Sequence, residues 1–301
     1  MKNSRINMLP WGARCFINVF CFIYMLACVL PLIIIISVSL SDETAIIEKG
    51  YGLLPRNFTT YAYEFVLREG IVIFNAYFVT ILATVAGTVL SLMVISMFAY
   101  PLSRKSLKYR SFFSMFVFIT MLFSGGLVPW YIVCSRLLHI TNTYLALILP
   151  YVMNVWYVII MRTFFVTTIP DSLIESAKID GASELKTFLK IVMPLSKPGL
   201  ATVGLFITIT YWNDWWLPLI LTTDQKYANL QFTLFRMLTN GELLIRMSQF
   251  TNVNTSKFIN LIPSESSRMA MCILAIGPIV LAYPFFQKYF IKGLTIGAIK
   301  G

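Results

Sequence analysis

The stretch ESAKIDGA, residues 175–182, is a polar segment in an otherwise apolar chain, and IVMP closes it at residues 191–194. Gly181 supplies the permissive backbone at which a helix commonly ends. Ser183, directly after this glycine, can cap a second helix, and Pro194 marks the exit of that helix. The pattern therefore predicts a helix, a tight turn and a second helix.

The loop of residues 167–198 that contains this pattern is expected to dock onto another protein. Thr168 is expected to cap its first helix, whose first turn holds Asp171. Small side chains leave a low surface on which a partner can seat closely. An ordinary amphipathic connector explains the caps, but it does not explain the small residues, the single glutamate and the terminal proline together. The candidate docking residues are Glu175, Ser176, Ala177, Asp180, Gly181, Ala182 and Pro194.

The rest of the chain has the composition of a membrane protein. Of its 301 residues 58% are hydrophobic and only 12% are charged, whereas globular proteins carry about 25% charged residues. Six apolar runs approach or exceed the roughly 20 residues that cross a bilayer as a helix, which predicts an all-α polytopic fold. The first run could instead be a signal peptide, but it exceeds the usual apolar length of about 7–15 residues, so we take it as a retained span. The six predicted spans cover residues 16–38, 71–100, 112–133, 144–161, 199–221 and 269–291.

The distribution of Lys and Arg predicts the orientation of these spans. With both termini in the cytoplasm, fifteen basic residues fall inside and nine outside, and the 104–110 loop carries four of them without an acid. This N-in, C-in topology places residues 1–15, the 167–198 loop and a tail of residues 292–301 in the cytoplasm, around one transmembrane domain of residues 16–301. The net charge of +11 then follows from basic loops that face anionic lipid, and it needs no nucleic acid.

Two other segments leave alternatives open. GGLVP at residues 125–129 breaks the third span, either as a packing kink or as the wall of a gate. Residues 223–267 form the longest external segment. The spacing of Leu230, Leu234, Met237 and Leu238 in it predicts an amphipathic helix near the outer surface. A loop of this length is either a contact surface for an external partner or a cap on the helices.

Cysteine and histidine give no sign of a metal centre. The five cysteines lie within or beside apolar spans without a CxxC pair, and the single histidine, His139, has no ligand partners nearby in the sequence. Packing of small hydrophobic side chains explains the cysteines better than a disulfide or a metal. We therefore expect no metal site.

Aromatic and amide side chains mark a candidate substrate path. YWNDWW at residues 211–216 is the densest cluster, and ligand pockets combine aromatic walls with a few polar groups. Asp214 is the only acid in a predicted span, and such charges usually face a cavity or a partner. An interfacial aromatic belt explains Trp215 and Trp216 nearly as well, whereas a mid-membrane amide such as Asn154 needs a partner. The candidate path residues are Asn154, Tyr157, Tyr211, Trp212, Asn213, Asp214 and Trp215.

The 175–194 pattern resembles the EAA signature of ABC importer permeases, E-A-A-x(3)-G-x(9)-I-x-L-P. Ser176 replaces the first alanine of the signature and Met193 replaces the leucine. The other positions stand in register: Glu175, Ala177, Gly181, Ile191 and Pro194.

Further stretches resemble the carbohydrate-importing permeases of this family, and the resemblance covers nearly the whole chain. The C-terminal stretch is closely similar to that of the maltose-type second permease, and the nearest kin are permeases for complex oligosaccharides or polysaccharide fragments. The stretches are FSGGLVP at 123–129, ALILP at 146–150, RTFF at 162–165, WNDW at 212–215 and QKYFIKGLTIGAIKG at 287–301.

The resemblance implies a type I ABC importer permease fold and an alternating-access permease for carbohydrate in the bacterial plasma membrane. In such permeases the loop is a coupling helix that sits in a cleft of a cytoplasmic ATPase, which implies that Glu175 pairs with a basic ATPase residue. The tail residues Gly297, Lys300 and Gly301 would reach toward the ATPase dimer interface. The implied partners are a second, different permease, an ATPase dimer that binds ATP and Mg, an extracytoplasmic solute-binding protein, an oligosaccharide and membrane lipid. The chain itself would bind no cofactor directly and would not be an enzyme.

Two other classes compete with this interpretation. A secondary carrier driven by an ion gradient usually needs intramembrane ionisable groups or paired broken helices, and the chain offers only Asp214 and one glycine-proline break. A membrane enzyme needs a clustered nucleophile, base or metal, and the scattered acids form no such cluster. No G-x-x-x-x-G-K motif occurs, so an importer of this kind must draw its energy from a separate ATPase.

Overall fold

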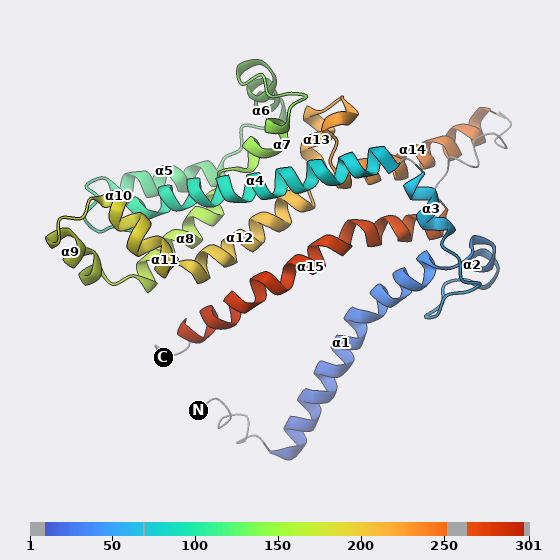
Figure 1. Cartoon of the computed structure of the whole chain (residues 1–301), viewed down its shortest axis with the longest axis horizontal. Helices are drawn as coiled ribbons and strands as arrows, with labels where there is room; N and C mark the ends of the chain where they lie inside the picture. Colours follow the sequence, from blue (N-terminus) through green and yellow to red (C-terminus); the bar gives the residue numbers. More distant parts are fainter. Residues whose placement is uncertain (1–9, 69, 252–263, 298–301) are drawn as a thin grey trace. The chain divides into compact units, whose positions relative to one another are not determined.

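The computed structural model describes residues 10–68, 70–251 and 264–297, with side chains for 10–68, 70–240, 264–280 and 284. Regular structure in these ranges is helical, apart from one antiparallel bridge between Ser41 and Phe58. Figure 1 shows these helices along the chain. The chain divides into two compact units. The prediction of a single transmembrane domain over residues 16–301 stays a prediction. Unit 1 comprises Met1–Gly70 and Met237–Ile276, and unit 2 comprises Ile71–Arg236 and Gly277–Gly301.

Unit 1 begins with α1, Trp11–Ser39, an apolar helix that is open along most of its length. Only Ser37, Val38 and Ser39 at its end are buried, so most of its apolar side chains are open to lipid or to neighbouring proteins. Two short helices follow, α2 at Glu43–Lys49 and α3 at Tyr61–Leu67. Asp42 caps α2, because its carboxylate accepts hydrogen bonds from the amides of Thr44 and Ala45.

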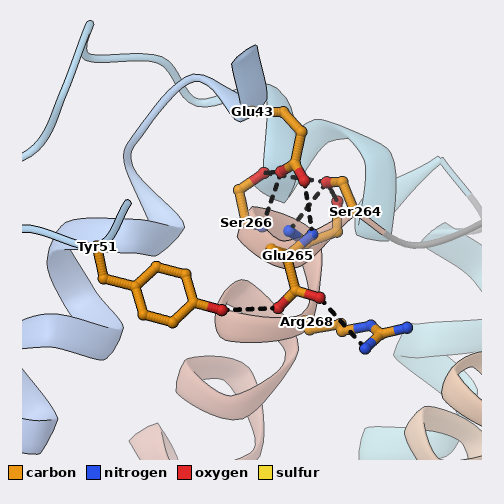
Figure 2. Close-up of polar contacts among 7 residues, drawn as sticks. Glu43, Tyr51, Ser264, Glu265, Ser266 and Arg268 are labelled. Carbon is orange, nitrogen blue, oxygen red and sulfur yellow. Dashed lines mark hydrogen bonds and ion pairs between the residues drawn. The ribbon is translucent and has the colours of Figure 1, made fainter. Parts of the chain in front are cut away.

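A cluster of polar contacts joins α2 to the start of the last helix, α15, at Glu265–Gly297 (Figure 2). The Glu43 carboxylate accepts hydrogen bonds from the backbone amides of Glu265 (3.0 Å) and Ser266 (3.1 Å) and from the Ser266 hydroxyl (3.0 Å). Glu265 in turn accepts from Tyr51 at 3.1 Å and forms an ion pair with Arg268 at 3.3 Å. Glu43 therefore caps α15 from another part of the chain, where the orphan amides of a helix N-terminus favour an anion.

Unit 2 is built around α4, Gly70–Ser103, the longest helix that lies almost wholly within it. Ile95, Ala99 and Tyr100 of α4 pack with side chains from several later helices into one core. Tyr211 lies directly against α4 because Gly87 offers no side chain there. A Cβ at Gly87 would lie 2.5 Å from the Tyr211 ring. The other core side chains include Val158, Met161, Phe165, Ile174, Phe188, Val192, Val203 and Ile207.

The remaining helices of unit 2 are short and bent against one another. The predicted third span is broken by 108° at residues 123–126, where Gly126 has φ +86°, and the fourth is bent by 52°. Asn154 and Ser183 cap helices through their side chains. These elements are α5 Arg110–Leu122, α6 Leu127–Ile132, η2 Val133–Leu137, α7 Tyr144–Ile148, η3 Leu149–Tyr151, α8 Val155–Thr168, α9 Asp171–Ile179, α10 Glu184–Thr187, η4 Phe188–Val192, α11 Met193–Leu195, α12 Lys197–Trp212, α13 Trp216–Leu221, η5 Gln225–Tyr227 and the start of α14, Leu230–Thr251.

The helices match the predicted apolar runs in part. Within the described ranges, α1 and α4 alone are long and apolar enough to cross a membrane, and up to five spans result if each bent pair counts as one. The fifth run, 199–221, is divided between α12 and α13, and the sixth, 269–291, lies in α15. Helix α14 confirms that the predicted external segment contains a helix beginning at Leu230. The number of spans therefore stays a prediction.

Candidate functional site

The turn between α9 and α10 has the geometry that its sequence predicts. Gly181 follows the end of α9 with φ +76°, a left-handed conformation that side chains disfavour. The amide of Ala182 donates to the carbonyl of Ala177 at 2.9 Å, and the amide of Gly181 donates to that of Lys178 at 3.0 Å. This pair of hydrogen bonds is the Schellman arrangement that closes a helix C-terminus. The chain therefore reverses tightly after Gly181.

Helix caps on both sides of this turn test two further predictions. The Ser183 hydroxyl accepts a hydrogen bond from the amide of Lys186 at 3.3 Å, which confirms the predicted cap of the second helix. The predicted cap by Thr168 is wrong. Thr168 is the last residue of α8, and α9 begins at Asp171 after Pro170, which provides no side-chain cap. Thr168 cannot cap α9 because it still belongs to α8, whose helix continues through this residue.

The two faces of α9 differ in what they contact. Ile174 and Ala177 are buried, and Ile174 belongs to the core of unit 2. Ala177 therefore lies beneath the exposed surface, although it was grouped with the docking residues. Glu175 is exposed and makes no hydrogen bond or ion pair within the described part of the chain. The other exposed or partly exposed docking candidates are Ser176, Asp180, Gly181, Ala182 and Pro194.

Exposed apolar side chains surround these polar ones. Ile179 at the end of α9 is 86% exposed and Leu185 on α10 is 61% exposed. A large side chain this open to solvent is typical of a surface that another protein covers. The loop thus offers the carboxylates of Glu175 and Asp180, unpaired within the described residues, and at least two open apolar side chains beside a glycine turn.

Asp171 ties the start of α9 to the loop after α4. Its carboxylate oxygens lie 3.3 Å from an Arg104 nitrogen and 3.1 Å from Lys105 Nζ. The hydrogen bond and charge of Lys105 lower the pKa of Asp171 below its ordinary value, and Arg104 adds to this effect. Asp171 is half exposed, and a surface pair of this kind positions two segments more than it stabilises the fold.

Glu184 makes the second connection, at the start of α10. One carboxylate oxygen lies 2.6 Å from Lys178 Nζ on α9, and the other accepts a hydrogen bond from the Tyr100 hydroxyl at 3.0 Å. Glu184 therefore links both helices of the turn to the last turns of α4. We call these two connections, through Asp171 and Glu184, the α4 bracket.

The residues of α4 and its loop in this bracket had no predicted role at the site. Arg104 and Lys105 were considered only for the orientation of the spans, and Tyr100 was not considered. A cavity of about 240 Å³ lined by Tyr100, Arg104 and Asp171 lies beneath the start of α9. The cluster of basic residues directly after α4 was the signal that could have pointed to acidic partners on the loop.

The end of the loop leads into α12 through a sharp bend. The π-helical turn η4 is followed by α11, which contains Pro194, and the chain then bends by 80° before α12. Pro194 is exposed, and proline without an amide is suited to the start of a new turn. In the C-terminal tail, Gly297 ends α15, and Lys300 and Gly301 lie outside the described residues.

Three of the candidate path residues are buried within unit 2. The Tyr211 hydroxyl donates to the carbonyl of Ile148 at 2.8 Å, and Trp212 is 5% exposed. Asp214 caps α13, because its carboxylate accepts from the amides of Trp216 and Leu217 at 3.2 Å each and from Tyr151 at 3.1 Å. A charge in a membrane span requires hydrogen-bond partners, and these contacts supply them for Asp214. The carboxylate of Asp214 therefore has a structural role.

The other four candidate path residues are at least partly exposed. Asn154 is exposed, but its side chain caps α8 by accepting from the amide of Trp156 at 2.9 Å. Asn213 is exposed between α12 and α13, and Trp215 stacks on Phe235 at 4.8 Å while 42% exposed. Tyr157 is half-buried against Phe206. Asn213 and Trp215 are therefore the path candidates with surface free for a ligand. No group of His, Cys, Asp and Glu within the described ranges could hold a metal ion.

Comparison with known proteins gives consistent matches over this architecture. Residues 91–296 match the family described as "Binding-protein-dependent transport system inner membrane component". The chain is 36% identical over 302 residues to the polygalacturonan/rhamnogalacturonan transport system permease protein YtcP of Bacillus subtilis (strain 168), with both chains covered completely. It is 37% identical to protein LplC of the same organism, over 91% of this chain and 90% of LplC.

A solved structure is similar over nearly the same length. It is a chain of a bacterial ABC transporter involved in the import of the acidic polysaccharide alginate, with a TM-score of 0.78 and 30% sequence identity. The match covers 94% of this chain and 99% of that one. The fold of the chain is accordingly that of an ABC importer permease, and the family match includes the whole α9–α10 turn. The chain belongs to the family of binding-protein-dependent transport system inner membrane components.

Proposed function

We infer that this chain is the permease subunit of an ATP-driven ABC importer that takes up carbohydrate. Its family consists of inner membrane components of transport systems, and relatives such as YtcP are named as saccharide transport permeases. The chain is thus a multi-pass membrane permease and not an enzyme, and a separate ATPase hydrolyses the ATP. An ion-gradient-driven carrier, the competing interpretation, has no support from these relatives.

The α9–Gly181–α10 turn is the observation that supports coupling to the ATPase. It presents Glu175 without an internal partner and Ile179 with an open apolar surface, and the α4 bracket fixes the turn to the longest helix of unit 2. A partner that moves this turn would move α4 with it, because packed helices transmit displacement rather than absorb it. We propose that the turn seats in the ATPase, with Glu175 paired to a basic ATPase residue. ATP and Mg would bind the ATPase, and no cofactor would bind this chain.

The membrane arrangement is part of the proposal. Six spans with both termini inside would put the turn, the basic 104–110 loop and the tail with Gly297, Lys300 and Gly301 on the cytoplasmic side. The partners would be a second permease, different from this chain, an ATPase dimer and an extracytoplasmic solute-binding protein. The external segment of residues 223–267 would lie on the side from which that binding protein delivers substrate.

An oligosaccharide fragment of a polysaccharide is the proposed substrate. The relatives carry names for polygalacturonan, rhamnogalacturonan and arabinooligosaccharides, and the similar solved chain belongs to an importer of an acidic polysaccharide. Asn213 and Trp215 combine an exposed amide with an exposed aromatic face, which is the chemistry that binds sugar hydroxyls and ring C–H surfaces. We propose these two residues for the substrate path ahead of Tyr211, Trp212 and Asp214, which are used in packing.

Glu175→Ala in the complete transporter tests the coupling role. The tagged chain is purified with its partners, and the substrate-stimulated ATPase rate is measured for the wild type and the variant. A lost charge-assisted hydrogen bond at an interface costs about 2–5 kcal/mol, so we expect the complex to weaken or the stimulation to fall at least ten-fold. The thermal unfolding midpoint of the isolated chain is expected to stay unchanged, because Glu175 has no partner in the described part of the chain.

Glu48→Ala is the matched control. Glu48 is also exposed on a short helix, α2, in the segment predicted to lie outside the cell. We expect its ATPase rate to equal that of the wild type. Equal rates for wild type and Glu175→Ala would contradict the coupling role, and transport without any co-purified ATPase would overturn the importer itself.

A further inference from the structure

We propose that an anionic phospholipid binds in the crevice between α5 and α8, with its phosphate held by Arg162 and by Arg110 beside it. The crevice has a volume of about 400 Å³ and is lined by residues of both helices, which pack against each other in unit 2. Arg162 and Leu102 line the crevice, and Arg110 is joined to them through the carbonyl of Leu102. Its position in the cytoplasmic leaflet rests on the proposed orientation of the chain. The binding site itself does not depend on that orientation.

The two arginines converge on one carbonyl at the end of α4. Arg110 Nε and Arg162 Nε each donate to the carbonyl oxygen of Leu102, both at 3.0 Å. That oxygen is one of the unpaired carbonyls at a helix C-terminus, which favours positive charge. Each guanidinium still has four N–H donors on its two terminal nitrogens. Neither arginine forms an ion pair with an acid in the ranges that the structure describes.

Two guanidinium groups that share one carbonyl acceptor repel each other, and an anion beside them relieves that repulsion. A phosphate can accept hydrogen bonds from both at once, and arginine is the side chain best shaped for that contact. The bracket acids Asp171 and Glu184 do not supply this anion, because they are engaged by Arg104, Lys105, Lys178 and Tyr100. The charge therefore points to an anion from outside the chain.

The polar end of the crevice has further unmet donors. Ser114 lines the crevice, and its Oγ is buried without a hydrogen-bond partner within the described ranges. Ser111 lies beside it on the first turn of α5, whose N-terminus lacks a side-chain cap. Helix N-termini favour phosphate through their free amides and the helix dipole. A phosphate oxygen in this crevice would give the Ser114 hydroxyl the hydrogen-bond partner that it lacks, close to Arg162, which lines the same crevice.

The order of side chains along both helices matches a lipid rather than a free anion. On α5, Ser111 and Ser114 come first, and Met115 and Phe118, which are 59% and 44% exposed, come deeper into the predicted span. On α8, which runs in the opposite sense through the membrane, Ile159 comes before Arg162. Both helices therefore place polar groups at the membrane surface and apolar groups below it. A phosphate head with an acyl chain beneath it fits this order, whereas inorganic phosphate would leave the apolar half open.

Native mass spectrometry of the purified complete transporter tests the site. The complex is exchanged into detergent with phosphatidylglycerol or with phosphatidylcholine of the same acyl chains, and retained lipid is counted. We expect phosphatidylglycerol to be retained in preference, and Arg110→Gln or Arg162→Gln to weaken its retention about five- to ten-fold each. Lys108→Gln is the matched control, because Lys108 is an exposed basic residue of the same loop. It should retain lipid as the wild type does.

A second variant keeps the test valid if loss of an arginine disturbs the fold. Ile159→Trp fills the apolar half of the crevice and leaves both arginines in place, and it should also lower retention. Equal retention of the two lipids, equal losses for Lys108→Gln and Arg162→Gln, or displacement of the lipid by inorganic phosphate would overturn the proposal. ATPase activity is measured in the same preparations. Loss of coupling in Glu175→Ala with lipid still bound separates the two proposals.

Discussion

At the scale of single residues, the close approach of Tyr211 to α4 depends on Gly87. A Cβ at this position would lie 2.5 Å from one ring carbon and 2.7 Å from two others, and the ring cannot retreat because its hydroxyl bonds to Ile148 and Ser91. We expect Gly87→Ala to destabilise the protein by about 1–3 kcal/mol through overpacking. The measurement is the thermal unfolding midpoint of the chain in detergent.

Gly12→Ala is the control for this prediction. Gly12 also lies in a long helix, α1, but nothing lies within 4 Å of the position its Cβ would take. Alanine is the better helix former by about 1 kcal/mol, so this variant should be neutral or slightly more stable. A wild-type midpoint for Gly87→Ala would show that the Tyr211 ring is not held against α4.

Local features of single residues could be predicted from the sequence, and tertiary ones could not. The Ser183 cap and the Gly181 turn depend on neighbours within five residues, so their spacing was sufficient. Asp214 was expected to face a cavity or a partner, and its carboxylate accepts hydrogen bonds from partners within unit 2. Those partners include Tyr151, which is 63 residues away, and no pattern in the sequence indicates that contact.

At the scale of elements, the α4 bracket should control how firmly α9 is held. Asp171→Asn removes the charge that Arg104 and Lys105 neutralise, and we expect faster amide hydrogen exchange along α9 together with a lower substrate-stimulated ATPase rate. Asp180→Asn is the control for the exchange measurement alone, because Asp180 is exposed directly after the last residue of α9 and its carboxylate makes no hydrogen bond or ion pair in the described ranges. Equal exchange in both variants would contradict a positioning role for Asp171.

The pH dependence of this contact has a defined sign. Because the pKa of Asp171 is lowered in the folded protein, its stabilising contribution is complete above the ordinary value of 3.8 and is lost as the pH falls through the lower folded value. Protection of α9, corrected for intrinsic exchange, should therefore be flat from pH 8 to about 5. A fall within that range would require another titrating group.

The contact between α2 and α15 gives a second prediction for elements. Glu43→Gln should weaken the cap on α15, because the charge that accepts from Glu265 and Ser266 becomes neutral (Figure 2). Helix caps contribute about 0.5–2 kcal/mol, so exchange at the first turn of α15 should rise several-fold. Glu48→Gln, an exposed glutamate on the same helix, should leave that exchange unchanged.

The bends between the helices of unit 2 could not be predicted from the pattern of apolar residues alone. Runs of apolar residues located the helices. The pattern of residues 112–133 could not predict the 108° break, because hydropathy carries no information on the direction of a helix axis. Gly125 and Gly126 were identified as a break, and the angle follows from a left-handed Gly126 that only the folded backbone reveals. The predicted span of 199–221 likewise missed the separation that Asp214 creates by capping α13.

At the scale of the whole molecule, the distribution of charge makes the orientation testable. A chain in which the five native cysteines are replaced by serine can carry one new cysteine at an exposed lysine, either Lys108, Lys186 or Lys226. The basic 104–110 loop and the α9–α10 turn should lie on the same side, because Asp171 and Arg104 are in contact. Lys226 lies in the segment predicted to be outside.

A membrane-impermeant maleimide added to intact cells should therefore label only the variant with cysteine at position 226. The variants at 108 and 186 should react only after the membrane is opened, since basic loops are retained on the cytoplasmic side. Labelling of 108 and 226 from the same side would contradict the N-in, C-in topology. It would also remove the α9–α10 turn, which is proposed to seat in the ATPase, from the side where ATP is available, so the same experiment constrains the importer mechanism.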